Sequence, residues 1–247
     1  MPRSVDVSRY ATLRPFDNAE NLNFMNYLSH GYRFLENPLF LAGTAVPDWL
    51  SVVNRRVRAR SRRVEAFQQV SDDPSELEIA RGIMQHHKDD DRFHRSELFM
   101  TLEADLGKSF RRHMPDPYDH RPGFLGHIVV ELMLDATLAD NDSKLLDRFY
   151  SAMQDVPEEL VQSTVNKIAS RQTDRLAWFI DRFREERFLY DYATDDGMFV
   201  RLNQVLKRVK LPQMETHVVD VLAEARELLK VHASALLAVV EGPVETT

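Results

Sequence analysis

The chain contains no cysteine and only eight glycines in 247 residues. The lack of cysteine excludes both a disulfide framework and thiolate chemistry. The first residues lack the apolar core of a signal peptide, and no apolar run approaches the ~18 residues of a membrane span. The alternation of apolar and polar residues that is typical of half-buried strands is nearly absent as well. We therefore expect a soluble cytoplasmic protein that has no membrane contact.

The charge balance also excludes a class of partner. Charged residues of both signs are plentiful, and the net charge of −7 argues against a general nucleic-acid binder. The length allows one large domain or two small ones. Because helical periodicity runs through most of the chain, we predict an all-α, single-domain helical bundle over residues 21–247, preceded by an N-terminal extension over residues 1–20.

Histidine and aspartate are concentrated between residues 81 and 94, in a segment that otherwise reads as helix. At 3.6 residues per turn, His86, Asp90 and His94 share one stripe, and His87 and Asp91 form a second stripe beside it. Taken alone, such a polar stripe is most often a solvated helix face.

A second stripe makes the solvated face a weaker explanation. His127, Glu131 and Asp135 are again four residues apart, but they lie in a segment that is apolar at nearly every other position. Such a helix is expected to be buried, and a buried carboxylate is costly unless it is paired or bound to a metal. Two facing helices that each offer imidazole and carboxylate groups are a common way to build a metal pocket in a helical protein.

Asp48 is a lone acid in the apolar segment Leu39–Val53, directly after Pro47. It can be read as the cap of a helix that resumes at the proline, or as a further ligand.

Six arginines occupy nine positions shortly after this segment: Arg55, Arg56, Arg58, Arg60, Arg62 and Arg63. One interpretation is a solvated helix face. The other is a site for an anionic partner, because no acidic residues accompany the arginines.

Several of these residues recur at the spacing of a known family. Met25-Asn26-Tyr27-Leu28-Ser29-His30, followed by Gly43 and the pair Asp48-Trp49, resembles the opening of bacterial acyl-carrier-protein phosphodiesterases. The next motif, Gly-Ile-x-x-His-x-x-x-Asp, is matched by Gly82, Ile83, His86 and Asp90, and two acids four residues apart are matched by Glu131 and Asp135. Phe188–Tyr192 and the helices that follow look like the C-terminal half of that family, so the resemblance covers roughly residues 25–237.

The resemblance implies an all-helical fold similar to the HD-type phosphohydrolases. It also implies manganese-dependent hydrolysis of the phosphodiester that joins 4′-phosphopantetheine to a serine of acyl carrier protein. The acidic partner would then be acyl carrier protein, captured by the arginine run. The positions that match the family pattern, and that we expect to bind the metal, are His30, Asp48, His86, Asp90, Glu131 and Asp135.

The chain departs from the family pattern at three positions. Thr44 replaces an asparagine, His94 stands where an aspartate is common, and Ala136 replaces a histidine. The residue at 136 keeps a second hypothesis open, a non-catalytic helical protein that binds a partner, with or without a metal, and has no turnover. His127 faces away from position 136, so a substitute must come from another helix, and His94 and His87 are the nearest candidates by sequence. Our hypothesis is that His94 takes over a ligand or proton-transfer role.

Chemistry and geometry limit the metal and its ligands. Mixed imidazole and carboxylate ligands suit manganese, iron or magnesium better than structural zinc. Residues eight apart on a helix are separated by ~12 Å, so one ion cannot take both ends of a stripe. One ion would use His86 and Asp90 together with Asp135 or Glu131, with His30 as an additional candidate. Two ions, typically ~3.5–4 Å apart, could use more of these residues. The predicted catalytic residues are Asp48, as a ligand or as the base that orients water, Asp90 and His94.

Overall fold

The computed structural model describes residues 26–114, 116 and 120–241. The predicted N-terminal extension, residues 1–20, lies outside this range. Within it every regular element is helical, which confirms the all-α prediction. The elements are α1 (Tyr27–Gly31), η2 (Tyr32–Phe34), α2 (Pro38–Val53), α3 (Ser61–Gln68), α4 (Pro74–Arg95), α5 (Glu97–His113), α7 (Pro122–Asn141), α8 (Leu145–Gln154), α9 (Glu158–Ile168), α10 (Leu176–Glu186), η3 (Phe188–Ala193), α11 (Asp195–Arg208), η4 (Thr216–Val218) and α12 (Val219–Glu241).

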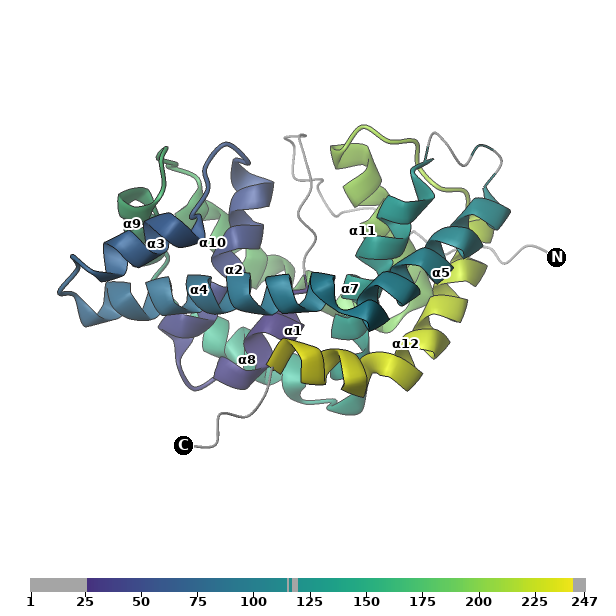
Figure 1. Ribbon diagram of the computed structural model, residues 1–247, viewed down its shortest axis with the longest axis horizontal. Helices are drawn as coiled ribbons and strands as arrows, with labels where there is room; N and C mark the ends of the chain where they lie inside the picture. Colours follow the sequence, from purple (N-terminus) through teal and green to yellow (C-terminus); the bar gives the residue numbers. More distant parts are fainter. Residues whose placement is uncertain (1–25, 115, 117–119, 242–247) are drawn as a thin grey trace.

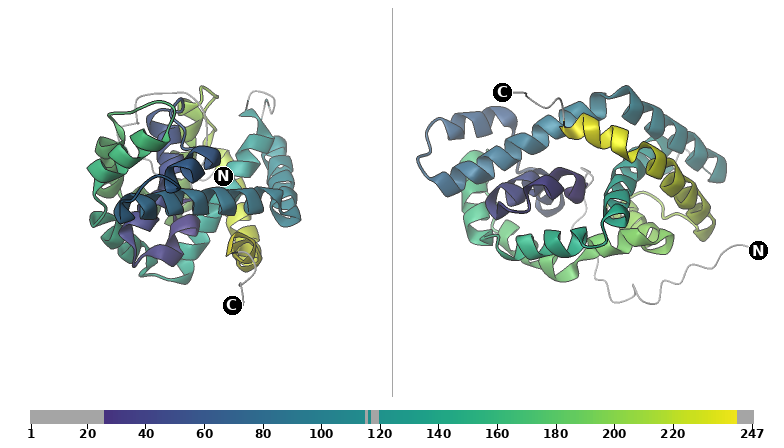
Figure 2. Two further views of the ribbon diagram at one scale, coloured as in Figure 1. Left: turned by 60° about the vertical axis from the view of Figure 1, so that its left-hand side comes forward. Right: turned by 90° about the horizontal axis from the view of Figure 1, so that it is seen from below.

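Helix α4 joins two groups of helices (Figure 1). Toward its N-terminal end it packs against α2, α3 and α9, and toward its C-terminal end against α5 and α12. The most extensive helix pairs are α2 with α4 and α5 with α7. Seen from below, α12 lies alongside the C-terminal half of α4 (Figure 2). The two polar stripes predicted from the sequence lie on α4 and α7, and the C-terminal end of the stripe on α4 lies beside the stripe on α7.

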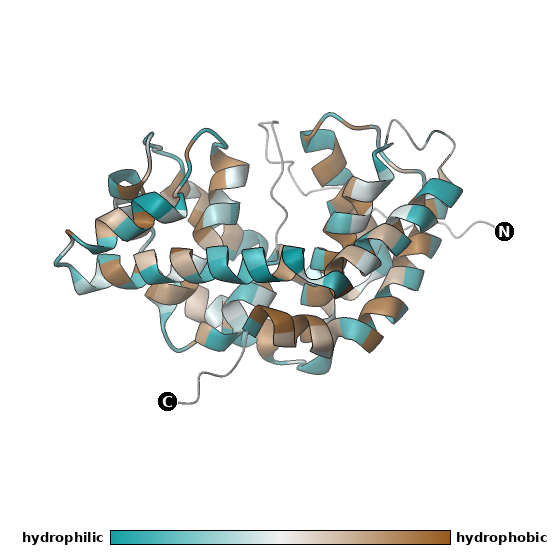
Figure 3. Cartoon of the chain, viewed as in Figure 1, coloured by the Kyte–Doolittle hydropathy of each residue, from teal (hydrophilic) through white to brown (hydrophobic). Residues whose placement is uncertain are grey.

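Helix α4 has a mixed surface because only one face is buried. Its buried residues include Ile79, Ile83, His86 and Phe93, which recur at helical spacing. The outward turns at its centre are hydrophilic, whereas α12 shows long apolar stretches (Figure 3). Asp73 caps the N-terminus of α4 by accepting hydrogen bonds from two backbone amides of its first turn.

An aromatic cluster holds in place α1 and α2, the helices that carry the predicted ligands His30 and Asp48. The ring of Phe183 on α10 packs edge-on against Tyr27, at 4.8 Å between centroids, and against Trp49, at 5.5 Å. Tyr27 and Trp49 are both almost completely buried. The cluster therefore holds α1 and the middle of α2 at fixed positions, close to His30 and Asp48.

Helix α7 corrects one expectation from the sequence. By length and composition it could cross a membrane, although no such apolar run was expected. However, 78% of its most apolar window is buried inside the protein, where it packs against α5 and α12. This burial is that of a core helix.

Candidate metal centre

The close crossing of α2 and α4 depends on two glycines. A Cβ atom added to Gly43 would lie 2.3 Å from the carbonyl oxygen of Ile79, and one added to Gly82 would lie 2.2 Å from that of Phe40. These separations are far below van der Waals contact, so only glycine allows the two backbones to meet here. Asp48 follows Gly43 by five residues and His86 follows Gly82 by four, so the crossing brings the two polar segments together.

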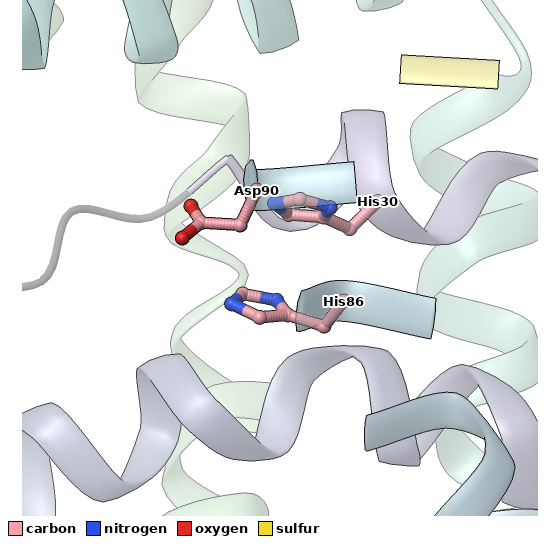
Figure 4. A group of neighbouring side chains, drawn as sticks. All are labelled: His30, His86 and Asp90. Atoms are coloured by element: carbon pink, nitrogen blue, oxygen red, sulfur yellow. The ribbon is translucent and has the colours of Figure 1, made fainter. Parts of the chain in front are cut away.

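Three predicted ligands meet beside this crossing. One ligand atom each from His30, His86 and Asp90 lies within 4.8 Å of the others. The two imidazole rings lie one above the other with centroids 4.3 Å apart, and the carboxylate of Asp90 is on the same side as their outer nitrogens (Figure 4). Both histidines are buried and Asp90 is partly exposed. Solvent therefore reaches the group at Asp90.

The backbone orients His86. Its Nδ1 donates a hydrogen bond to the carbonyl oxygen of Thr44 at 2.9 Å, which leaves Nε2 as the free acceptor. Burial and the neighbouring His30 lower the pKa of His86 well below its usual value, so the ring is neutral. A neutral imidazole whose other nitrogen is fixed by a carbonyl is the usual form of a metal-binding histidine.

Asp89, which was not among the predicted site residues, supports His30. Its carboxylate is completely buried and lies 3.7 Å from Nδ1 of His30. Arg33 and Gln85 each donate a hydrogen bond of 2.7 Å to it, one to each oxygen. The helical period contained the signal, because position 89 lies three residues after His86 and four before Phe93, on the buried face of α4.

Several buried polar atoms around this centre have no hydrogen-bond partner in the part of the chain that the structure describes. They are both ring nitrogens of His30, Oδ2 of Asp48 and Oε2 of Glu131. Buried polar groups are nearly always satisfied, and unpaired ones at a cluster of histidine and acid side chains are typical of a metal site. The residues present therefore fit a divalent metal.

Asp48 lies within α2 and not at its N-terminus, because the helix continues through Pro47. The cap interpretation is therefore wrong. The side chain is 2% exposed. Burial, and then the charges of Glu131, Asp90 and Asp135, raise the pKa of Asp48 well above its usual value. Acids from α2, α4 and α7 thus face one another.

A second group lies next to the first. One ligand atom each from His94, His127 and Glu131 lies within 4.8 Å of the others, and the two rings are stacked with centroids 4.7 Å apart. Oε1 of Glu131 accepts from Nε2 of His94 at 3.0 Å and lies 3.3 Å from Nε2 of His127. Nδ1 of His94 lies 3.1 Å from Asp90. His94 therefore links the two groups.

The pairing of His94 sets its protonation. Burial would lower its pKa, but the hydrogen bonds with Asp90 and Glu131 raise it to about 10. Burial acts in the opposite direction on the acid Asp90 and would raise its pKa, but the hydrogen bond with His94 lowers that pKa to about 2. His94 is therefore a cation between two carboxylates.

Asp135 belongs to neither group. Its two oxygens accept hydrogen bonds from the backbone amides of Leu28, at 2.9 Å, and Ser29, at 2.8 Å. It thus holds the first turn of α1, the helix that carries His30. Burial raises the pKa of Asp135 to about 7, although these two amide bonds act to lower it.

The structure therefore divides the predicted ligands into three sets. His30, His86 and Asp90 meet in one group, Glu131 lies in the second with His94, and Asp135 positions α1. Asp48 is coupled by charge to both groups.

The chain matches no family model, no curated protein and no solved structure. The resemblance to acyl-carrier-protein phosphodiesterases therefore stays a prediction.

Proposed function

We propose that the protein is a metal-dependent phosphodiesterase with an HD-like helical arrangement, acting on the 4′-phosphopantetheine phosphodiester of acyl carrier protein or on a related phosphoester. The observation that carries the proposal is the group of His30, His86 and Asp90, whose ligand atoms converge. Among the described residues, neither ring nitrogen of the buried His30 has a hydrogen-bond partner. Such mixed nitrogen and oxygen ligands suit manganese, iron or magnesium, and the family resemblance favours manganese.

His30, His86 and Asp90 would hold the ion, with Asp48 as a fourth ligand or as the base that orients water. A divalent metal here would offset the negative charge of the phosphodiester and lower the pKa of water. In the reaction, the oxygen of water attacks phosphorus, the bond from phosphorus to the leaving oxygen breaks, and Asp48 accepts the proton of water. The protonated His94 supplies the proton that the leaving oxygen takes up.

The arginine run supports an acidic macromolecular partner. It occupies the loop after α2 and the first turn of α3, and four of its members, Arg56, Arg60, Arg62 and Arg63, are exposed. Within the described ranges, these four and Arg58 form no ion pair with an acidic side chain. The loop is tied to the metal centre, because Nε2 of His87 donates a hydrogen bond to the carbonyl of Ala59 at 2.8 Å. An acidic carrier protein on these arginines would therefore be held beside His86.

The proposal is tested by elemental analysis of protein purified without chelator, and by hydrolysis of holo-acyl carrier protein and bis(p-nitrophenyl) phosphate with added manganese. Asp90→Ala should lose both metal and activity. Asp91→Ala is the matched control, because Asp91 is exposed and, among the described residues, pairs only with Arg95 at 2.8 Å. Equal metal content and equal rates in the two variants would refute the proposal.

A second candidate is a helical metal-binding protein without turnover. It is favoured by position 136, where the family resemblance expects a histidine and this chain has an alanine that is 1% exposed in the core. The assay compares the wild type with His94→Ala and His127→Ala. If all three bind metal and none hydrolyses a phosphodiester, the result supports this candidate over the enzyme.

A further inference from the structure

A separate pocket lies between α2, α10, η3 and α11; it is partly open, and its unfilled space of about 370 Å³ includes solvent at its mouth. Its walls are mostly apolar and aromatic: Val52, Phe179, Phe188, Tyr192 and Val205. Its remaining lining comes from polar side chains of α11. Pockets that combine apolar walls with a few placed polar groups are the usual form of small-molecule sites.

The lining residues that come from α11 form one stripe of that helix. Arg201, Gln204, Val205 and Arg208 are spaced i, i+3, i+4 and i+7, so they share one face of the helix, and all four line the pocket. Two arginines thus face a largely apolar space.

The charge of Arg201 is already balanced. Its Nε donates a hydrogen bond to Asp191 at 2.7 Å, and its Nη1 donates one to Gln204 at 3.0 Å. Its guanidinium also lies over the ring of Phe188, 5.3 Å from the centroid. Arg201 is therefore held in place as part of the wall.

The charge of Arg208 is not balanced. Among the described residues it forms neither a hydrogen bond nor an ion pair, and its electrostatic neighbours are the phenols of Tyr27 and Tyr192 and the like charge of Arg201. Burial is the main cause that lowers its pKa. None of its nitrogens is a fully buried atom without a partner, so solvent reaches the guanidinium. An anion pairs more strongly with a partly buried cation than with an exposed one, and the guanidinium fork matches two oxygens of one anion.

We propose that this pocket binds a small organic oxyanion, whose apolar body lies against the aromatic walls and whose phosphate or carboxylate pairs with Arg208. Val52 follows Asp48 by four residues on α2, about one helical turn, so the bound molecule lies beside the metal centre without touching its ligands. The binding does not depend on the proposed phosphodiesterase activity.

The test is calorimetric titration of the full-length protein in buffer containing EDTA, so that metal-bound phosphate does not contribute. The probes are phenyl phosphate, benzoate, inorganic phosphate and benzyl alcohol. We expect phenyl phosphate, benzoate or both to bind more tightly than the last two, and the preferred one identifies the anion as phosphate or carboxylate. If neither aromatic anion binds, or if inorganic phosphate or benzyl alcohol binds as tightly, the proposal is overturned.

The variants assign the binding to Arg208. Arg208→Gln should raise the Kd of the bound anion about 10- to 100-fold, the usual effect of losing a charge-assisted pair. Lys207→Gln, which removes the same charge from the exposed neighbour, should leave Kd within about twofold. If Arg208→Gln does not fold, Arg208→Lys serves in its place, and the loss of the fork should weaken binding by about threefold or more. An unchanged Kd in the folded Arg208 variant overturns the proposal.

Discussion

The two histidine groups share residue types but differ in how their atoms are satisfied. In the first group, His30 and His86 are buried, and neither nitrogen of His30 has a hydrogen-bond partner within the described chain. In the second, His94 and His127 are about one-third exposed and both pair with Glu131. The first group therefore has ligand capacity left over, whereas much of that capacity in the second is used internally.

This difference separates two uses of the same residue types. Imidazole and carboxylate groups that satisfy one another form an ion-pair network, which needs no further ligand. Groups that are buried and converge unpaired need a cation or other partner. We therefore assign the metal to the first group and a supporting or proton-donating role to the second.

The largest expected effect concerns the helix crossings beneath the two groups. Gly82→Ala places a Cβ against backbone and should lower the free energy of unfolding by about 3 kcal/mol. The α5–α7 crossing near the second group is similarly tight at Gly126, whose added Cβ would lie 2.4 Å from the carbonyl oxygen of Glu103. It is looser at Gly107, where the nearest atom is 3.3 Å from the added Cβ. Gly107→Ala should therefore cost less than about 1 kcal/mol.

Chemical denaturation measures both effects. Gly123→Ala is the control, because nothing lies within 4 Å of the Cβ it would add. If the Gly82 and Gly107 variants lose equal stability, the two positions do not differ in tightness as described.

The next effect concerns metal affinity. His86→Ala should raise the metal dissociation constant by more than about 100-fold, above the range for residues that only support a ligand. His127→Ala should raise it by less than about 10-fold, because His94 still pairs with Glu131. Competition with a fluorescent chelator measures both constants. A larger loss in His127→Ala would reverse our assignment of the two groups.

A smaller effect is expected from the loss of Asp135, whose carboxylate accepts hydrogen bonds from backbone amides of α1. Asp135→Ala leaves two buried amides without acceptors and should lower the free energy of unfolding by about 2 kcal/mol. Because α1 carries His30, metal affinity should also fall, about 10-fold. Denaturation and metal titration should therefore change together. A loss of metal binding at full stability would instead make Asp135 a ligand.

The smallest effect concerns the arginine run, which lies on the side of the first group. Replacing Arg58, Arg60 and Arg62 with glutamine should slow association with acyl carrier protein severalfold at low salt and less at high salt, because salt screens exposed charges. Arg111 and Arg112 are exposed at the end of α5 and serve as the control pair. Stopped-flow association rates that fall equally in both variants would show a general charge effect and no docking site.

Contacts within one helix could be predicted from the sequence. The period of 3.6 residues placed His86 with Asp90 and His127 with Glu131, and both pairs are together in the structure. The helical fold class followed from the same periodicity and is confirmed.

Contacts between helices could not be predicted in the same way. Nothing in the local pattern distinguishes Asp135, which binds backbone amides of α1, from Glu131, which pairs with histidines. Likewise, Asp89 and not Asp90 pairs with Arg33, because Arg33 comes from a different element whose position the spacing along α4 does not give. These roles are set by the angle and depth at which helices pack, which spacing along one chain does not contain.

The bond from Asp135 to α1 has a consequence for the order of folding. The two partners are 107 residues apart, and the helix that they stabilise has only five residues, too few to persist alone in water. Closing so long a loop costs entropy that is repaid only once α7 is in place. A ribosome-bound chain that ends before α7 thus contains His30, His86 and Asp90 but cannot hold His30 in its position. The proposed metal centre is consequently assembled late, after α7 has met α1.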